Sequence, residues 1–205
     1  MKLLLFLLAT TLAGAEEYSR PAIIKAEALR EFTSLSEGRK KLVTTALSVA
    51  RGNGWLRYKF GSGDPKNKGF DCSGAMSHVL RTLSYKIPRS SSEQYLWIKK
   101  NKRFTPVDPK VISLKDPVFQ KLTPGDLVFW SGTYSPTDGR KTKITHVGMY
   151  LGTEKKDGRP VMICSSKGRS YRGARRDGYG VYDFKLPSSS SKSKFVGFDP
   201  PPGTK

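Results

Sequence analysis

Cysteine and histidine are the side chains that could supply a nucleophile and a base in this chain, and the sequence holds only two of each. Cys72 lies in residues 70–74 (FDCSG), and His146 opens residues 146–149 (HVGM). A thiol attacks a carbonyl carbon only as the thiolate, and a neighbouring imidazole can take its proton. This pair therefore indicates nucleophilic acyl transfer.

An apolar stripe behind Cys72 predicts the element that holds it. Residues 75, 76, 79, 80 and 83 are apolar at helical spacing, which predicts a helix over 73–83 after a loop at 61–69. Cys72 would then lie at the N-terminal edge of the helix. The unpaired N–H groups and the dipole of a helix start lower the pKa of a thiol there. We therefore expect Cys72 to ionise readily.

Geometry favours His146 over His78 as the base. His78 follows Cys72 by six residues, so the helical rotation places it off the face of the cysteine. His146 belongs to residues 145–151, where polar and apolar positions alternate as in a half-buried strand. Taken singly, a cysteine or a histidine is more often structural. Two of each are also too few and too scattered for a zinc site.

Five motifs in a fixed order carry a family resemblance. They are residues 58–61 (YKFG), 71–74 (DCSG), 87–91 (IPRSS), 124–130 (PGDLVFW) and 146–152 (HVGMYLG). With them the chain resembles the NlpC-type cysteine peptidases of bacterial cell-wall metabolism, from about residue 36 to residue 198. The resemblance implies a papain-like α+β domain, in which N-terminal helices, including the nucleophile helix, pack on an antiparallel sheet.

The resemblance also implies roles for individual residues. Cys72 would be the nucleophile, His146 the base and Tyr58 an active-site tyrosine near the thiol. Asp71 and Ser73 match positions that help to hold substrate in some members. Such enzymes cut amide bonds in the stem peptides of peptidoglycan, often the bond after D-glutamate. They use no cofactor and no metal.

The third catalytic position departs from the family pattern. Members usually carry a polar residue there, most often histidine, which orients the base; the aligned residue here is Cys164. Alternation along 161–166 also puts Ser166 on the side of His146. A thiol is a weak hydrogen-bond partner, so Cys164, Ser166 and water all remain candidates, as does a purely structural Cys164. We expect Cys72 and Cys164 both to be free thiols.

Composition and termini suggest an exported enzyme. Residues 1–15 read as a signal peptide, with an apolar run over 3–12 that is too short to span a bilayer. We expect a helical extension at 16–35 and one peptidase domain at 36–205, secreted or periplasmic and monomeric. A wall-binding module with weakened catalysis is the alternative, and a transferase with the same acyl-enzyme chemistry also stays open.

The formal net charge of +20 favours an anionic partner, although any single basic cluster can also be a solvated face. Three basic clusters stand out, at residues 99–103, 140–143 and 167–176. Anionic wall polymers and the carboxylates of peptidoglycan are the expected partners. Tyrosines among the arginines of the third cluster are also typical of nucleic-acid surfaces, but the export signal disfavours that reading.

The remaining pattern predicts helices first and strands afterwards, an α+β order. Helices are expected at 21–32, 35–51 and 90–100, the last from a capping box. An irregular segment is expected at 101–123, and a loop at 131–143 that forms a wall of the cleft. Strands are expected at 127–130, 145–151, 160–165, 180–184 and 194–199.

Overall fold

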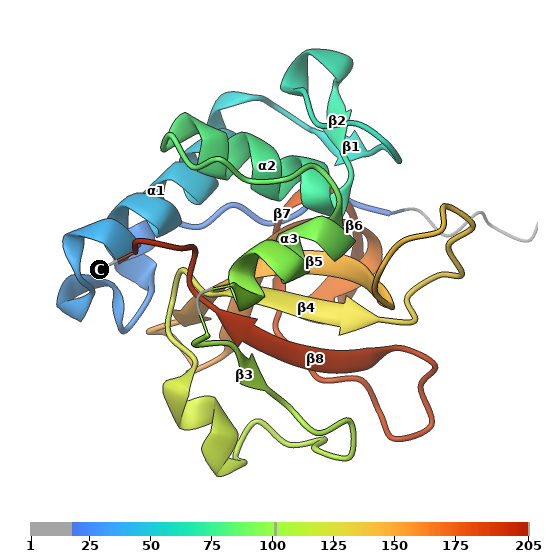
Figure 1. Cartoon of the computed structure of the whole chain (residues 1–205). Coiled ribbons are helices and arrows are strands. Elements are labelled where there is room, and N and C mark those ends of the chain that lie inside the picture. Colours follow the sequence, from blue (N-terminus) through green and yellow to red (C-terminus); the bar gives the residue numbers. More distant parts are fainter. Residues whose placement is uncertain (1–17, 101, 205) are drawn as a thin grey trace, which may run out of the picture.

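An antiparallel sheet covered by helices forms the body of the molecule, which confirms the α+β class (Figure 1). The computed structural model describes residues 18–100 and 102–204. The sheet order is β3-β8-β4-β5-β6-β7. Its strands are β3 (Thr105–Pro106), β4 (Leu127–Ser131), β5 (Ile144–Thr153), β6 (Pro160–Tyr171), β7 (Ala174–Asp183) and β8 (Lys194–Asp199). The five longer strands lie at the predicted places.

Each α-helix begins at a polar residue that caps it. Ser36 caps α1 (Glu37–Gly52), and Asp71 caps α2 (Cys72–Thr82). Ser90 and Glu93 form the predicted capping box at the start of α3 (Ser91–Lys99). A cap satisfies backbone N–H groups that have no partner within the helix, so these side chains fix where each helix begins. Cys72 is thus the first residue of α2.

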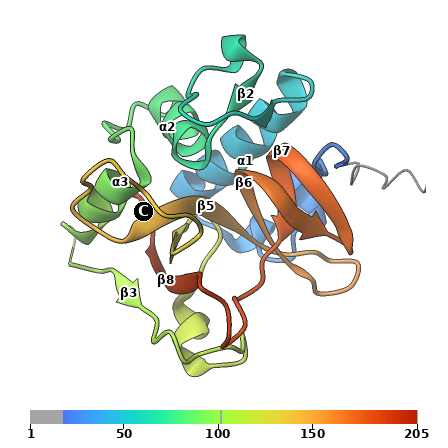
Figure 2. The ribbon, with the colours of Figure 1, turned by 90° about the vertical axis from the view of Figure 1, so that its right-hand side faces the viewer.

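Two apolar cores lie on opposite faces of the sheet. The first joins α1 and α2 to alternate residues of the central strands, among them Val147 and Ile163. The second lies beneath the other face, where Trp130 and Cys164 meet Phe119 from the 3-10 helix η4 (Pro117–Lys121). Figure 2 shows α1 and α2 above the sheet and the segment between β3 and β4 below it. The strands are therefore buried on both faces over much of their length.

The segment before α1 is not the predicted helix over 21–32. It runs extended, with two 3-10 turns at η1 (Ala26–Ala28) and η2 (Phe32–Ser34). Its backbone bonds to strands instead: Val181 N of β7 donates to Ala22 O at 2.9 Å, and Arg30 N donates to Thr153 O of β5 at 2.8 Å. Edge pairing thus overrides local helix propensity. The predicted signal peptide lies outside the described residues.

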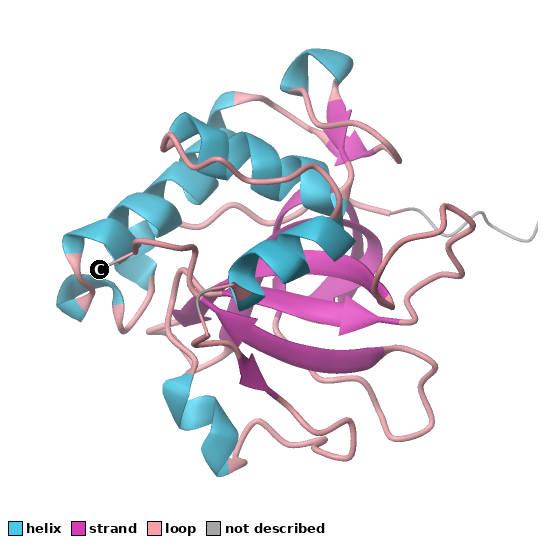
Figure 3. Ribbon diagram, in the orientation of Figure 1, coloured by secondary structure: helices cyan, strands magenta, loops and turns pink. Residues whose placement is uncertain are grey.

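Several short elements were not predicted from the sequence. A parallel pair, β1 (Arg57–Tyr58) and β2 (Gly69–Phe70), leads into α2, and η3 (Pro65–Asn67) interrupts the predicted loop between them. β6 and β7 extend well beyond their predicted ends as one long hairpin (Figure 3). Across the described residues, no helix has the length and apolar character needed to cross a membrane.

Candidate active site

The start of α2 packs against the open edge of β5. The β5–β6 ladder begins at the pair Met149–Ile163, so the edge of β5 at residues 145–147 has no partner in β6. The Cys72 thiol occupies that place and donates to the Thr145 carbonyl oxygen at 3.9 Å. On the other side of the gap, Ser165 Oγ donates to Phe70 O at 2.6 Å. The Cys72 thiol, the predicted nucleophile, therefore sits between two central strands of the sheet.

The protonation state of Cys72 differs from the sequence expectation. Burial raises the pKa of the thiol to about 11, and the Asp71 carboxylate adds to the rise. Backbone N–H groups of Val147, Ser73 and Cys72 itself act in the opposite direction. The helix start does favour the thiolate, as expected, but Cys72 is only 7% exposed and the cost of burying a charge prevails. The resting thiol is neutral.

His146 is buried beside Trp130, its register partner on β4. The two ring centroids lie 5.4 Å apart. Burial holds the pKa of His146 well below its usual value, and the Arg169 guanidinium lowers it further. Its Nε2 atom is buried and has no hydrogen-bond partner among the described residues. The imidazole is therefore neutral at rest, and no described side chain forms a hydrogen bond with its Nε2 atom.

Cys164 and Ser166 are the candidates for the third catalytic position. Both lie on the face of the sheet that carries His146, as the alternation predicts. Cys164 is fully buried in the core that contains Trp130, and a Cβ added to Gly148 would lie 3.1 Å from the Cβ of Cys164. Ser166 shares a recess with His146. Both cysteines are free thiols. Since neither Cys164 nor Ser166 bonds to His146 Nε2, a catalytic role for either stays a prediction.

The Asp71 carboxylate forms hydrogen bonds to neighbouring groups of the protein. It accepts from Gly74 N at 2.6 Å and from both terminal nitrogens of Arg89, at 3.0 and 2.7 Å. Arg89 also donates to Ser73 Oγ at 3.0 Å. The carboxylate thus caps α2 and holds Arg89 at the rim of the thiol. Contact of Asp71 and Ser73 with substrate stays a prediction.

A cleft of about 240 Å³ opens onto Cys72. Tyr58, Arg89, Tyr134 and Arg140 are among the residues that line it. Burial raises the pKa of Tyr58, and the charges that Cys72 and Asp71 can carry raise it further, so its hydroxyl is protonated and can donate. Tyr58 therefore lies where the resemblance implied, beside the thiol.

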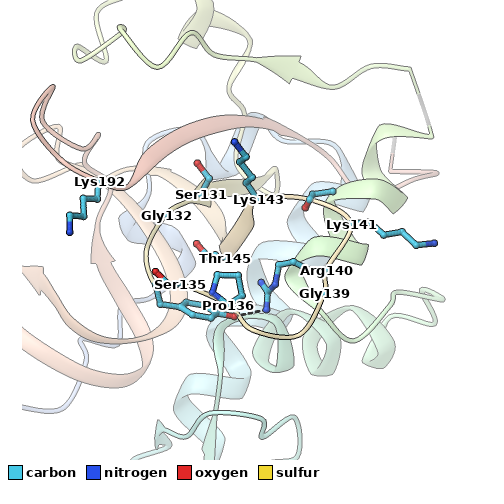
Figure 4. A pocket seen from close by; sticks show the side chains of 12 residues that line it. Ser131, Gly132, Ser135, Pro136, Gly139, Arg140, Lys141, Lys143, Thr145 and Lys192 are labelled. Carbon is cyan, nitrogen blue, oxygen red and sulfur yellow. Dashed lines mark hydrogen bonds between the residues drawn. The ribbon is translucent and has the colours of Figure 1, made fainter.

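The loop at 131–143 forms one wall, as predicted from its position. Arg140 holds it: its guanidinium bonds to Asp138 and to the Ile144 carbonyl, and donates to Tyr134 Oη at 2.7 Å. Figure 4 shows the loop curving around Thr145, with the side chain of Arg140 on its inner side and Lys192 outside the loop on the left. The cleft and the loop thus meet where β5 begins.

His78, the second histidine, is not part of this site. Its ring packs against Phe70 with centroids 5.2 Å apart. Three groups of the candidate active site were not predicted from the sequence: the Thr145 carbonyl, Arg89 and Arg169. Arg89 lies within the quoted motif at 87–91, and Thr145 directly precedes the motif at 146–152, which was the available signal. No group of His, Cys, Asp or Glu suited to hold a metal occurs in the described part of the chain.

The residues of the basic cluster at 167–176 have different surroundings in the folded protein. Arg172 is neutralised by Glu154 and Asp157, each at 2.8 Å. Tyr171 and Tyr179 are buried, and their hydroxyls donate to Glu154 and to the Ala46 carbonyl. Buried rings cannot stack on bases, so the feature that resembled a nucleic-acid surface is structural.

Comparison with known proteins fits this arrangement. The model of the NlpC/P60 family matches residues 54–171, and the chain belongs to that family. It is 35% identical over 96 residues to a gamma-DL-glutamyl hydrolase of Bacillus subtilis, covering 46% of this chain and 18% of the relative. It is 37% identical over 95 residues to the bifunctional muramidase/DL-endopeptidase CwlT of the same species, covering 46% and 22%.

The match to curated relatives is partial in length, since the chain spans less than a quarter of either. Among solved structures, an NLP/P60 family protein similar to a lipoprotein, from Staphylococcus aureus, is 22% identical with a TM-score of 0.47. The alignment covers 82% of this chain and 42% of that one.

Proposed function

We propose that this protein hydrolyses amide bonds in the stem peptides of peptidoglycan through a thioester on Cys72. The observation that carries the proposal is the insertion of the Cys72 thiol at the edge of β5, where it bonds to the carbonyl of Thr145, the residue before His146. A nucleophile at a helix start and a base on an adjoining strand are what acyl transfer requires. The cleft in front of the thiol gives a peptide access to it.

The neutral resting pair sets the order of proton transfers. His146 takes the thiol proton as sulfur bonds to the carbonyl carbon, and the carbonyl oxygen becomes an oxyanion. N–H groups at the start of α2, those of Cys72 and Ser73, are oriented to stabilise that charge. The imidazolium then protonates the leaving amine as the C–N bond breaks. Water, deprotonated by His146, finally cleaves the thioester and restores the thiol.

The substrate assignment draws on the relatives and on the cleft. Both curated relatives carry names that specify bonds of DL-peptides or D,L-glutamyl groups. We therefore propose a bond at a D-glutamyl residue, with Arg89 and Tyr58 at the rim as donors to the acyl half of the substrate. Action outside the cytoplasm follows from such a substrate. No cofactor is needed for these steps.

Mass spectrometry of defined muropeptides after incubation with the protein tests the proposal. The unmodified protein is expected to release two fragments from a peptide that contains D-glutamate. Cys72→Ala and His146→Ala should abolish release, while His78→Gln, outside the site, should retain it. Hydrolysis that persists in Cys72→Ala protein would refute the assignment.

A second candidate, a wall-binding module without turnover, is favoured by one observation. His146 Nε2 has no hydrogen-bond partner among the described residues, so none of them orients the imidazole through that atom. On that account the unmodified protein would bind isolated sacculi and release no fragments. Binding to sacculi that equals that of Cys72→Ala protein, with no turnover on any muropeptide, would support this candidate over the first.

A further inference from the structure

A second hollow lies on the His146 side of the site, beyond the cleft that opens onto Cys72. It has a volume of about 590 Å³. Thr145 lines the cleft and His146, the next residue along β5, lines this recess, so two consecutive residues at the start of β5 face the two hollows. The basic side chains that line the recess are Lys167, Arg169, Arg175, Lys185 and Lys192, and no acidic side chain is among its described lining residues.

Arg169 occupies the recess because of a β-bulge. Between the pairs Lys167–Asp177 and Ser170–Arg175, β6 carries one residue more than β7. Gly168 stands there with φ +93°, a conformation that favours glycine. The bulge brings the guanidinium of Arg169 over the Trp130 ring, 4.5 Å from its centroid. The bulge therefore directs the guanidinium of Arg169 towards His146, the proposed catalytic base.

The charge of Arg169 is uncompensated within the described chain. No carboxylate forms an ion pair with it, whereas Arg172, three residues on, is held by Glu154 and Asp157. Lys185 is partly neutralised by Asp183 at 3.1 Å. Lys167 and Lys192 are exposed and have no ion pair in the described structure. A partly buried guanidinium without an ion-paired carboxylate among the described residues, flanked by two ammonium groups that also lack one, is complementary to an anionic group of a ligand.

The chemistry of the site says which half of the substrate reaches this recess. The base that accepts the thiol proton returns it to the leaving amine, so the amine must lie within reach of His146. The recess is lined by His146 itself. The group attached to that amine is then directed past His146 towards Arg169.

We propose that the recess is a subsite for a carboxylate carried by the leaving-group half of the peptide, with Arg169 as its principal partner. This inference rests on the proposed hydrolase function for the direction of the substrate. A guanidinium binds a carboxylate through two parallel hydrogen bonds, and Lys167 and Lys192 at the mouth would steer the anion inwards. Arg169 is thus a specificity-determining residue.

Binding of product-like probes tests the subsite without turnover. We would titrate Cys72→Ala protein with glycylglycine and with glycylglycinamide, and follow the two imidazole resonances by NMR. The chain has only two histidines, so His78 is an internal reference. Glycylglycine should shift His146 alone and bind about tenfold more tightly than the amide, as expected for a hydrogen-bonded charge pair.

Matched variants give the result that would overturn the proposal. Arg169→Gln should remove the preference for the carboxylate, Arg169→Lys should keep part of it, and Arg172→Gln should keep all of it. Lys192→Gln, at an exposed position, should reduce it without risk to the fold. Equal binding of both probes to protein that retains Arg169 would refute the subsite, as would an unchanged preference in Arg169→Gln protein.

Measurements of turnover distinguish the subsite proposal from the hydrolase proposal on which it rests. Arg169→Gln should lower kcat/KM about tenfold more for a substrate whose leaving half ends in a carboxylate than for the matched carboxamide, on which it acts only through the pKa of His146. A carboxylate preference in the binding experiment together with absent turnover would remove the hydrolase proposal and the leaving-group direction. Equal losses on the two substrates would show that Arg169 does not read the carboxylate.

Discussion

The thiol of Cys72 is bonded to the backbone of Thr145, the residue immediately before His146, across 3.9 Å. Its proton is therefore held by a strand carbonyl in the resting protein. Burial of both side chains disfavours the separated charges of a thiolate and an imidazolium. The chemistry of this site consequently depends on proton transfer during the attack, and the protonation states below follow from that arrangement.

The pH dependence of thiol alkylation tests the neutral resting state. Because burial and Asp71 raise the pKa of Cys72 to about 11, the rate of its reaction with iodoacetamide should keep rising about tenfold per pH unit above neutrality. Peptide mapping by mass spectrometry assigns the label to Cys72. A rate that is already constant near neutral pH would instead show a preformed thiolate.

Asp71→Asn should separate reactivity from stability. Loss of the carboxylate charge removes the second cause of the raised pKa, so Cys72 should be alkylated faster at neutral pH. The same change weakens the ion pair with Arg89, which is partly exposed, and should lower the free energy of unfolding by about 1 kcal/mol. Alkylation kinetics and urea unfolding measure the two effects, and slower alkylation would contradict the electrostatic account.

The folding stability should depend on pH through His146. Its folded pKa is lowered, so the unfolded chain binds more protons once the pH drops below the unfolded pKa of about 6.5. Stability contributed by the neutral imidazole is thus present above that pH and is lost as the pH falls towards the folded pKa. His146→Gln should remove up to about 1.4 kcal/mol per pH unit from this slope.

Urea unfolding at several pH values measures that slope. His78→Gln is the matched control: burial also lowers the pKa of His78, but this residue is less buried and its removal should flatten the slope less. A slope that is the same in His146→Gln and unmodified protein would contradict the prediction.

Gly74 should tolerate no side chain. A Cβ at this position would lie 2.0 Å from the Ser62 carbonyl oxygen and 2.8 Å from the Cα of Gly63. Both contacts are backbone, so Gly74→Ala should destabilise the protein by about 3 kcal/mol or more and displace the start of α2. Gly52→Ala, where a Cβ meets nothing within 4 Å, should instead stabilise α1 by about 0.5 kcal/mol. Chemical denaturation compares the two.

Much of the fold was readable in the sequence because local signals agreed with the final packing. The apolar stripe of α2, the capping box of α3 and the alternation along β5 are each determined by residues close in the chain. The segment 21–32 was misjudged because its hydrogen-bond partners, such as Val181, lie far away in the sequence. No local pattern carries that information.

The residues of the candidate site were also only partly predictable from local sequence patterns. The pairing of Cys72 with the His146 strand, and the face of Cys164, followed from spacing and from family motifs. Arg169 did not, since strict alternation from Cys164 and Ser166 places residue 168 on the face of His146. The bulge at Gly168 shifts the register by one and brings Arg169 there instead. The raised pKa of Cys72 was missed because burial is a property of the whole packing.

The break in the β5–β6 ladder also governs when the site can exist. The thiol and its carbonyl partner are 73 residues apart in the chain. Contacts of such separation form late, because loop closure must be completed before they contribute. A chain that has formed α2 but has not yet assembled β5 holds a cysteine with no adjoining base. The proposed acyl-transfer activity would therefore appear only when the fold is complete, and its onset during refolding would mark that moment.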